Sequence, residues 1–267
     1  MEFGVCLNVI DSLRQGAEKL EEQLAAIAAA GYAYVEVTAV SFADAGDDEI
    51  AVIRAALAKH GLMAKRACIL FPGTLKVVGP EKNEENISGY LQKLMPKLKA
   101  VGMEIIVFGS GGARRIPDGF PYEEAFDQFC ESARLTADIA GEYGIRVALE
   151  HLNAGECNLL ISVEETVKAV RQANHPGCGL LFDIYHVRDP EDLRYVVAGK
   201  DVLFHSHTSH PTNRLYPAPG DEECLRPYFA VLKAAGYDGT VSVEANLHGS
   251  KSFSENMTDA YQLLTSF

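Results

Sequence analysis

One pattern recurs along this chain and restricts the folds that it can adopt. A helical stretch ends in alanine or lysine, a glycine follows, and an apolar strand comes directly after it. The copies span residues 24–37, 55–70, 97–110, 139–152 and 230–245, with glycines at Gly31, Gly61, Gly102, Gly144 and Gly236. Glycine ends a helix readily because it adopts the left-handed conformation without a Cβ penalty. The repeat predicts alternating helices and strands, which is typical of an α/β protein.

Three further apolar stretches, at 2–8, 177–186 and 202–209, bring the expected strands to eight. Most are continuous apolar runs, as expected of parallel strands that are buried on both faces. At roughly 33 residues per unit, the chain matches the ~250-residue size of a (β/α)8 TIM barrel. An open doubly wound sheet is the alternative, but "CLNVIDSLRQGAEKL" lacks the glycine-rich fingerprint expected after its first strand. Because no linker or composition break interrupts the pattern, we expect one barrel domain over residues 1–267.

Composition narrows the class of partner. With 24 Lys and Arg against 37 Asp and Glu, the net charge of −13 repels a polyanion, so we expect no nucleic-acid partner. No apolar run approaches the ~18 residues of a spanning helix, and no basic stretch precedes the first apolar run. We therefore expect no membrane association and no secretory signal. Six singly scattered cysteines favour free thiols in the cytoplasm over disulfides.

Side chains that can bind a metal follow the last four expected strands. Strand five ends at Glu150, strand six at Asp183 with His186 after it, strand seven at His207 and strand eight at Glu244. In a TIM barrel the reacting groups gather at the carboxyl ends of the strands. Each residue alone has an ordinary explanation, such as a salt bridge or a helix cap. A single metal site explains all four strands at once.

The donor set indicates which ion such a site would hold. Three carboxylates and one imidazole suit a hard divalent ion, with Mn²⁺ as first choice and Mg²⁺ or Co²⁺ as alternatives, whereas Zn²⁺ more often recruits cysteine or more histidine. His205 shares a strand face with His207 and lies deeper, so we expect it to be a hydrogen-bonded core histidine.

These residues carry a resemblance to a known family. The segments "FDIYH", "HSHTSHPTNR" and "VEAN", with a pair of glutamates six residues apart, resemble the xylose-isomerase-like TIM barrels. Within these, they are similar to the sugar epimerases related to D-tagatose 3-epimerase and D-psicose 3-epimerase. The resemblance implies that Glu150, Asp183, His207 and Glu244 hold the metal and that Glu156, His186 and Arg214 bind the substrate. Related barrels commonly pair, although the sequence leaves the oligomeric state open.

The chemistry explains why two glutamates are needed. A proton on the carbon next to a carbonyl is weakly acidic, and a divalent ion stabilises the enediolate that forms when this proton leaves. Glu150 and Glu244 would remove and return the proton. Transfer on opposite faces gives an epimerase, whereas return to the neighbouring carbon gives an aldose–ketose isomerase. We expect a ketose 3-epimerase that acts on a sugar or a sugar-derived small molecule.

Other functions on this scaffold remain as alternatives. A hydroxypyruvate isomerase or an inosose dehydratase-like enzyme would share the metal pattern of the late strands. An endonuclease IV-like repair enzyme would need histidines on the early strands and a basic rim, and both are missing. A non-catalytic carbohydrate- or metal-binding protein would not need both glutamates. The loop at 108–115 also stays open: Arg114 and Arg115 would either grip an anionic group or lie solvated on a flexible loop.

Overall fold

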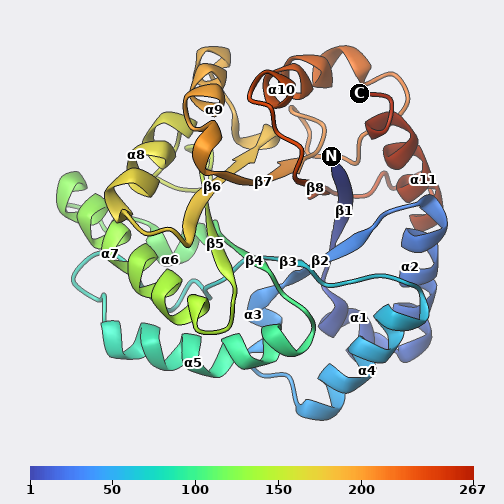
Figure 1. The fold of residues 1–267 in the computed structure, drawn as a ribbon, viewed down its shortest axis with the longest axis horizontal. Coiled ribbons are helices and arrows are strands. Elements are labelled where there is room, and N and C mark those ends of the chain that lie inside the picture. Colours follow the sequence, from blue (N-terminus) through green and yellow to red (C-terminus); the bar gives the residue numbers. More distant parts are fainter.

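Eight parallel strands close into a barrel in sequence order, from β1 to β8 and back to β1 (Figure 1). The computed structural model describes residues 1–267. The strands are β1 (Glu2–Leu7), β2 (Tyr34–Thr38), β3 (Arg66–Cys68), β4 (Ile105–Phe108), β5 (Arg146–Glu150), β6 (Cys178–Asp183), β7 (Leu203–Thr208) and β8 (Thr240–Val243). The predicted (β/α)8 TIM barrel is confirmed.

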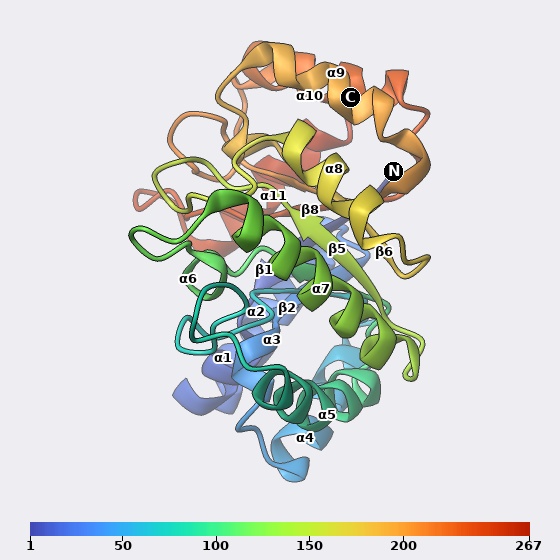
Figure 2. The same cartoon turned by 90° about the vertical axis from the view of Figure 1, so that its left-hand side faces the viewer.

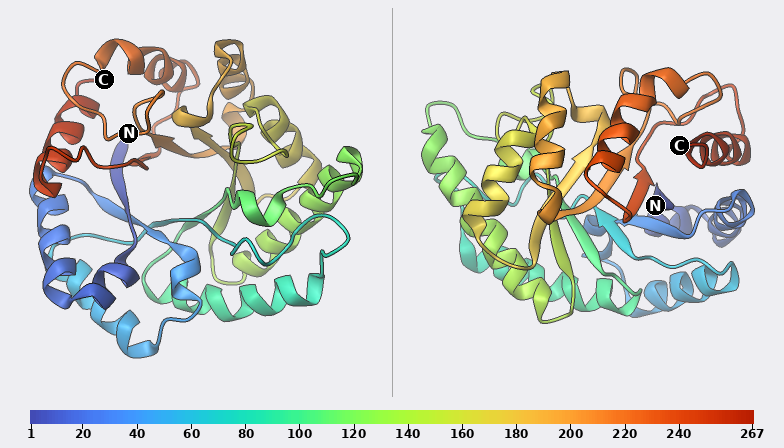
Figure 3. Two further views of the ribbon diagram at one scale, coloured as in Figure 1. Left: turned by 180° about the vertical axis from the view of Figure 1, so that it is seen from behind. Right: turned by 45° about the horizontal axis from the view of Figure 1, so that its top comes forward.

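Helices surround the barrel on the outside, as the end-on and tilted views show (Figures 1 and 3). The α-helices are α1 (Val9–Gln15), α2 (Ala17–Ala30), α3 (Ala39–Phe42), α4 (Asp47–Lys59), α5 (Glu84–Ala100), α6 (Gly111–Arg114), α7 (Tyr122–Gly141), α8 (Val163–Ala173), α9 (Arg194–Ala198), α10 (Glu222–Ala234) and α11 (Phe253–Leu264). Three short 3₁₀ turns are η1 (Ile184–His186), η2 (Pro190–Leu193) and η3 (Lys200–Val202). None of the helices is long and apolar enough to cross a membrane.

The glycines that were expected to end the helices do adopt the left-handed conformation. All five have positive φ, from 68° at Gly61 to 105° at Gly31. At Gly31 the backbone N–H donates to the carbonyl oxygens of Ala28 and Ile27, the last turn of α2. At each turn the chain passes from a helix to the next strand, and the side view shows helices on the outside of the strands (Figure 2).

The inside of the barrel is apolar on one side and polar on the other. Ile105, Val107, Ala148 and Leu181, from β4 to β6, form a small buried cluster of their own. On the opposite side the Tyr34 hydroxyl contacts Ser242 Oγ at 2.8 Å, and the ring of Tyr34 fills the place that a side chain on Gly4 would take. Buried polar groups need hydrogen-bond partners, so this half depends on a connected polar network. That network leads up to the site.

Candidate active site and metal centre

Four side chains converge at the carboxyl ends of the late strands. One ligand atom each from Glu150, Asp183, His207 and Glu244 lies within 4.8 Å of the other three. They come from β5, β6, β7 and the residue after β8, which are neighbours around the barrel. The structure therefore brings together all four residues that were predicted from the strand ends. We call them the carboxylate–histidine cluster.

Three of the four residues of this cluster have a buried ligand atom that lacks a hydrogen-bond partner. Glu150 Oε1, Asp183 Oδ2 and His207 Nδ1 make no hydrogen bond. The other oxygen of Asp183 is occupied, because Oδ1 accepts from the backbone N–H of Tyr185 at 2.8 Å. Leaving one buried acceptor unsatisfied costs about 1–3 kcal/mol, and more for a charged group. Three such atoms at one point fit a bound divalent cation.

Glu36 sets the orientation of His207. This glutamate lies on β2, is fully buried, and contacts His207 Nε2 at 3.0 Å through Oε1 and His205 Nε2 at 2.8 Å through Oε2. When Nε2 of His207 donates to Glu36, Nδ1 keeps the lone pair that a metal needs. The expectation that His205 is a hydrogen-bonded core residue is confirmed, since its Nδ1 contacts Thr240 Oγ1 at 2.8 Å.

Sequence reasoning missed Glu36. The signal was present in "YVEVT", where one ionisable residue interrupts an apolar strand that is buried throughout most of its length. A buried carboxylate without a partner is costly, so such a glutamate predicts a cation or a histidine opposite it. Its partner is 171 residues away in sequence, and no local pattern identifies it.

His186 presents a donor to the cluster. Its Nδ1 lies 2.9 Å from Asn153 Nδ2 and accepts from the Asn153 backbone N–H at 3.2 Å, so the ring proton is on Nε2. Nε2 makes no hydrogen bond and lies 3.4 Å from Asp183 Oδ2 and 4.0 Å from Glu150 Oε1. Burial, reinforced by neighbouring cationic groups, lowers the pKa of His186 to about 2, so the imidazole is neutral. A neutral imidazole N–H here can donate to a substrate oxygen.

Arg214 contacts two glutamates, Glu244 and Glu156, at the mouth of the barrel, which is the end where the strands have their carboxyl ends. Its Nη2 donates to Glu244 Oε2 at 2.6 Å, its Nη1 to Glu156 Oε1 at 3.2 Å, and its guanidinium lies 4.7 Å from the centre of the Tyr185 ring. The backbone of Arg214 is left-handed, with φ at 57°, and its carbonyl accepts from the N–H of Asn246 at 2.7 Å. The loop after β7 is thus tied to the loop after β8. The structure places Arg214, Glu156 and His186 beside the cluster.

At Arg114 the loop after β4 differs from both of its sequence interpretations. Residues 111–114 form the short helix α6, and Arg114 is fully buried instead of solvated or free to grip an anionic group. Its Nη1 donates to the carbonyl oxygen of Glu150 at 2.7 Å and to that of Phe108 at 3.3 Å. Arg115 points outward and donates to the carbonyl oxygen of Glu156 at 2.7 Å. Both arginines therefore brace the backbone around the site.

Crowded charges shift the protonation of the cluster. Burial, followed by the charge of Glu150, raises the pKa of Asp183 to about 8, and burial also raises the pKa of Glu150. Burial alone would lower the pKa of His207, but Glu36 and Glu150 outweigh it and hold this pKa well above its usual value. Without a cation, protons reduce the repulsion between these groups. A divalent ion would replace those protons.

Comparison with known proteins agrees with this geometry. A family model described as xylose isomerase-like TIM barrel matches residues 24–265. The chain belongs to this family. Within it, the chain is 26% identical over 227 residues to an L-ribulose 3-epimerase from Methylomonas sp., covering 83% of this chain and 77% of the relative. It is 23% identical over 231 residues to a D-psicose 3-epimerase from Agrobacterium fabrum, covering 82% and 76%.

Solved structures of the same family share the fold. A D-allulose 3-epimerase from Methylomonas sp. superposes with a TM-score of 0.84 at 22% sequence identity, covering 100% of this chain and 97% of that chain. The curated relatives are named as epimerases, which agrees with the prediction that this chain is an isomerase. The early strands β1 to β4 carry no histidine, in keeping with the argument against a repair endonuclease.

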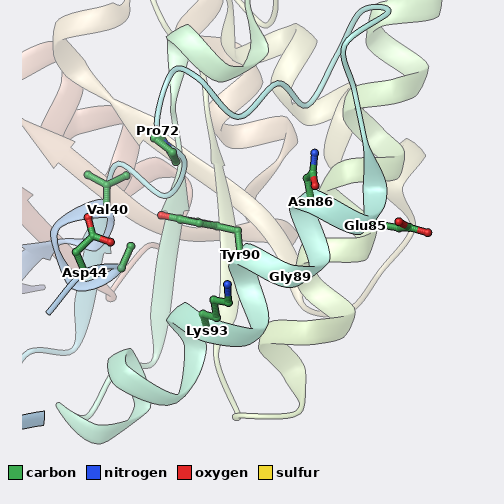
Figure 4. A pocket seen from close by; sticks show the side chains of 9 residues that line it. Val40, Asp44, Pro72, Glu85, Asn86, Gly89, Tyr90 and Lys93 are labelled. Carbon is green, nitrogen blue, oxygen red and sulfur yellow. The ribbon is translucent and has the colours of Figure 1, made fainter. Parts of the chain in front are cut away.

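A separate hollow lies outside the mouth. About 490 Å³ in volume, it is bordered by α5 and the segment around α3, and Asp44, Glu85, Tyr90 and Lys93 line it (Figure 4). It contains no histidine, no cysteine and no member of the carboxylate–histidine cluster. The hydroxyl of Tyr90 is already used, because it donates to the carbonyl oxygen of Leu70 at 2.8 Å. This hollow therefore offers none of the chemistry of the carboxylate–histidine cluster.

Proposed function

We propose that this family member is a ketose 3-epimerase that holds one divalent ion, Mn²⁺ as first choice with Mg²⁺ or Co²⁺ as alternatives. The ligands would be Glu150, Asp183, His207 and Glu244. One observation carries the proposal: buried ligand atoms from β5, β6 and β7 converge without any hydrogen-bond partner. The relatives of this chain are named as epimerases of ketoses, which supports the choice of reaction.

Glu150 and Glu244 would carry the protons. A bound divalent ion would supply positive charge where negative charge develops on the substrate oxygens as the proton leaves. Glu150 and Glu244 belong to strands three places apart, and their carboxylate oxygens lie within 4.8 Å of one another. One glutamate would remove the proton from the carbon beside the carbonyl, and the other would return a proton on the opposite face. The carbon would thereby be inverted.

Three further side chains would hold the sugar. The neutral Nε2–H of His186 is free to donate to the substrate oxygen that gains charge. Arg214 presents a fixed guanidinium beside Glu244 and would steady the same region of the substrate. The carboxylate of Glu156 is 40% exposed and would accept hydrogen bonds from hydroxyl groups at the mouth.

The test separates the two faces of the reaction. Glu150→Gln and Glu244→Gln each keep the shape of the side chain but cannot carry a proton, so turnover of a ketose should fall about 10²- to 10⁴-fold in each. Each variant retains one carboxylate, so it should still exchange the C3 proton with D₂O for one epimer. The two variants should act on opposite epimers. Deuterium NMR with Mn²⁺-loaded protein measures both results.

Suitable controls make this experiment decisive. Glu142→Gln changes an exposed glutamate at the end of α7 and should leave exchange and turnover unchanged. Metal content must be measured in every sample, because both glutamates are also proposed ligands. If both variants keep the metal and neither exchanges deuterium, the two-base mechanism is wrong. Deuterium on the adjacent carbon would instead indicate an aldose–ketose isomerase or a hydroxypyruvate isomerase, and loss of water an inosose dehydratase-like enzyme.

The substrate, the cellular location and the oligomeric state of this protein stay predictions. We propose a small-molecule sugar substrate, a cytoplasmic location and a barrel that pairs with a second copy. All six cysteines are free, as the expectation of a reducing compartment requires. We also propose that residues 1–267 act as one domain, since all eight strands belong to the same closed barrel.

A further inference from the structure

Two thiols lie on the early side of the mouth, next to Glu244. The sulfur atoms of Cys6 on β1 and Cys68 on β3 and one carboxylate oxygen of Glu244 lie within 4.8 Å of one another. Cys68 is buried and Cys6 is partly exposed. We propose that these three residues, the thiol cluster, form a second cation site that binds a thiophilic divalent ion such as Zn²⁺ and thereby inhibits the enzyme. This role rests on the proposed function of Glu244.

The backbone geometry argues against a disulfide at this place. β1 and β3 both pair with β2 and not with each other. Through β2, Cys6 lies opposite Arg66, so the two cysteines are separated by two strand spacings across the sheet, about 9 Å, and by two residues along it. A disulfide needs Cα atoms within ~7 Å, whereas two sulfurs that bind one Zn²⁺ at ~2.3 Å each lie about 3.8 Å apart. A bridging ion therefore suits the thiols better than a covalent bond.

Competing groupings of the same donors are less suitable. Cys6 also lies near Glu36 and His207, but those two side chains already pair with each other at 3.0 Å. Elsewhere, His210 lies with Asp221 and Cys224 in a third group. His210 Nδ1 accepts from the backbone N–H groups of Thr212 and Asn213, so its Nε2 carries the proton and offers no lone pair to a cation. In the thiol cluster, the Cys68 thiol donates to the carbonyl oxygen of Val37 at 3.7 Å and keeps its sulfur lone pairs, while Glu244 accepts from Arg214 through Oε2.

Glu244 belongs to both cation sites, and this gives the thiol cluster its effect. Hard ions such as Mn²⁺ prefer the carboxylate–histidine cluster, whereas thiolates select softer ions. When a soft ion binds, the two S–H protons go to solvent and two metal–sulfur bonds form. The same ion would occupy the carboxylate of Glu244 and remove it from proton transfer. We therefore expect Mn²⁺ to activate and Zn²⁺ or Cd²⁺ to inhibit.

The test uses Cd²⁺, because its bonds to sulfur give an ultraviolet charge-transfer absorption that oxygen and nitrogen ligands do not. All proteins carry Cys224→Ser, which removes the only other cysteine that is not buried. Cd²⁺ titrated into this protein should produce the absorption at one equivalent. Cys6→Ser or Cys68→Ser should weaken that binding about tenfold or more and reduce the absorption. Cys130→Ala, a buried thiol between α7 and α8, is the matched control and should change neither.

Each outcome has a definite meaning. If no absorption appears, or if it survives both serine substitutions, the thiol cluster is not a cation site. If Cd²⁺ binds through both thiols but Mn²⁺-loaded turnover is unaffected, the shared role of Glu244 is wrong. If Cd²⁺ binds and no ketose is epimerised with Mn²⁺ alone, the cation site stands and the proposed function fails.

Discussion

The two halves of the barrel mouth differ in what they supply. The late strands, β5 to β8, deliver every member of the carboxylate–histidine cluster. The early strands deliver the thiols of Cys6 and Cys68, the buried support of Glu36 and, after β4, a glycine. A side chain on that glycine, Gly109, would collide with the carboxylate of Glu150. The late half supplies ligands, and the early half supplies space and orientation.

This difference indicates how the barrel positions a cation. Ligands from neighbouring strands would hold an ion toward the late half of the mouth. The thiols of the early half would remain for a softer ion. Buried polar networks of this kind are rigid when every member is satisfied. Variants on the two halves should therefore fail in different ways.

The largest effect is expected on the late half. Asp183→Ala removes one of the four proposed ligands and should lower metal affinity by more than the ~10- to 100-fold typical of an outer-shell partner. It also relieves the repulsion among three crowded carboxylates, so the stability of the metal-free variant should not fall in proportion to the loss of metal affinity. Metal analysis after dialysis, together with thermal unfolding of the metal-free protein, measures both effects.

A matched change on the early half controls this prediction. Asp44→Ala removes an exposed carboxylate that follows α3 and lines the outer hollow (Figure 4). It should retain the full metal content. Equal metal content in Asp183→Ala and Asp44→Ala would exclude the carboxylate–histidine cluster as the metal site.

A second, smaller effect should come from the support that the early half gives. Glu36→Gln keeps the shape of the side chain but loses the charge that orients His207, so metal affinity should fall about 10- to 100-fold. Tyr34→Phe, on the same strand, breaks the contact with Ser242 without touching His207. Both variants should be less stable, but only Glu36→Gln should bind the metal more weakly. Calorimetric titration with Mn²⁺ decides, and equal affinities would show that Glu36 is purely structural.

The sequence was informative wherever the answer depends on position along one strand. The repeated glycine turns, the eight strands and the ligands at four strand ends follow from local patterns and from the rule that barrel strands present their ends together. Asp183 is an example, since "LLFD" indicates both a buried strand and the carboxylate at its end that can bind a metal. The copy at residues 55–70 gives only a short strand, because β3 ends at Cys68 and the chain leaves the sheet at Ile69, where φ is 53°.

What the sequence could not supply depends on contacts across the barrel. Glu36 meets its histidines only when β2 and β7 are placed around one ring, and the pairing spans 171 residues. The guanidinium of Arg114 looks solvent-exposed in "GGARR", yet α6 turns it inward to the carbonyl oxygens at the ends of β4 and β5. Both are charged groups buried by the closure of the barrel. Secondary-structure propensity and residue spacing along the chain do not indicate which side chains meet when the barrel closes.

The smallest expected effect is a pH dependence that belongs to the late half alone. The pKa of Asp183 is raised to about 8, so below this pH the metal-free protein holds a proton there, and the raised pKa of His207 adds a second. A cation binds only the deprotonated ligands, so binding must release these protons. Affinity should then fall about tenfold per pH unit for each proton released, as pH drops below about 8. Mn²⁺ calorimetry in buffers of different ionisation enthalpy counts the protons, and Asp44→Ala should give the same count as the unmodified protein. If proton release does not grow as the pH falls from about 9 to about 6, the crowded carboxylates are ionised without a cation. The charge argument for the site would then be lost.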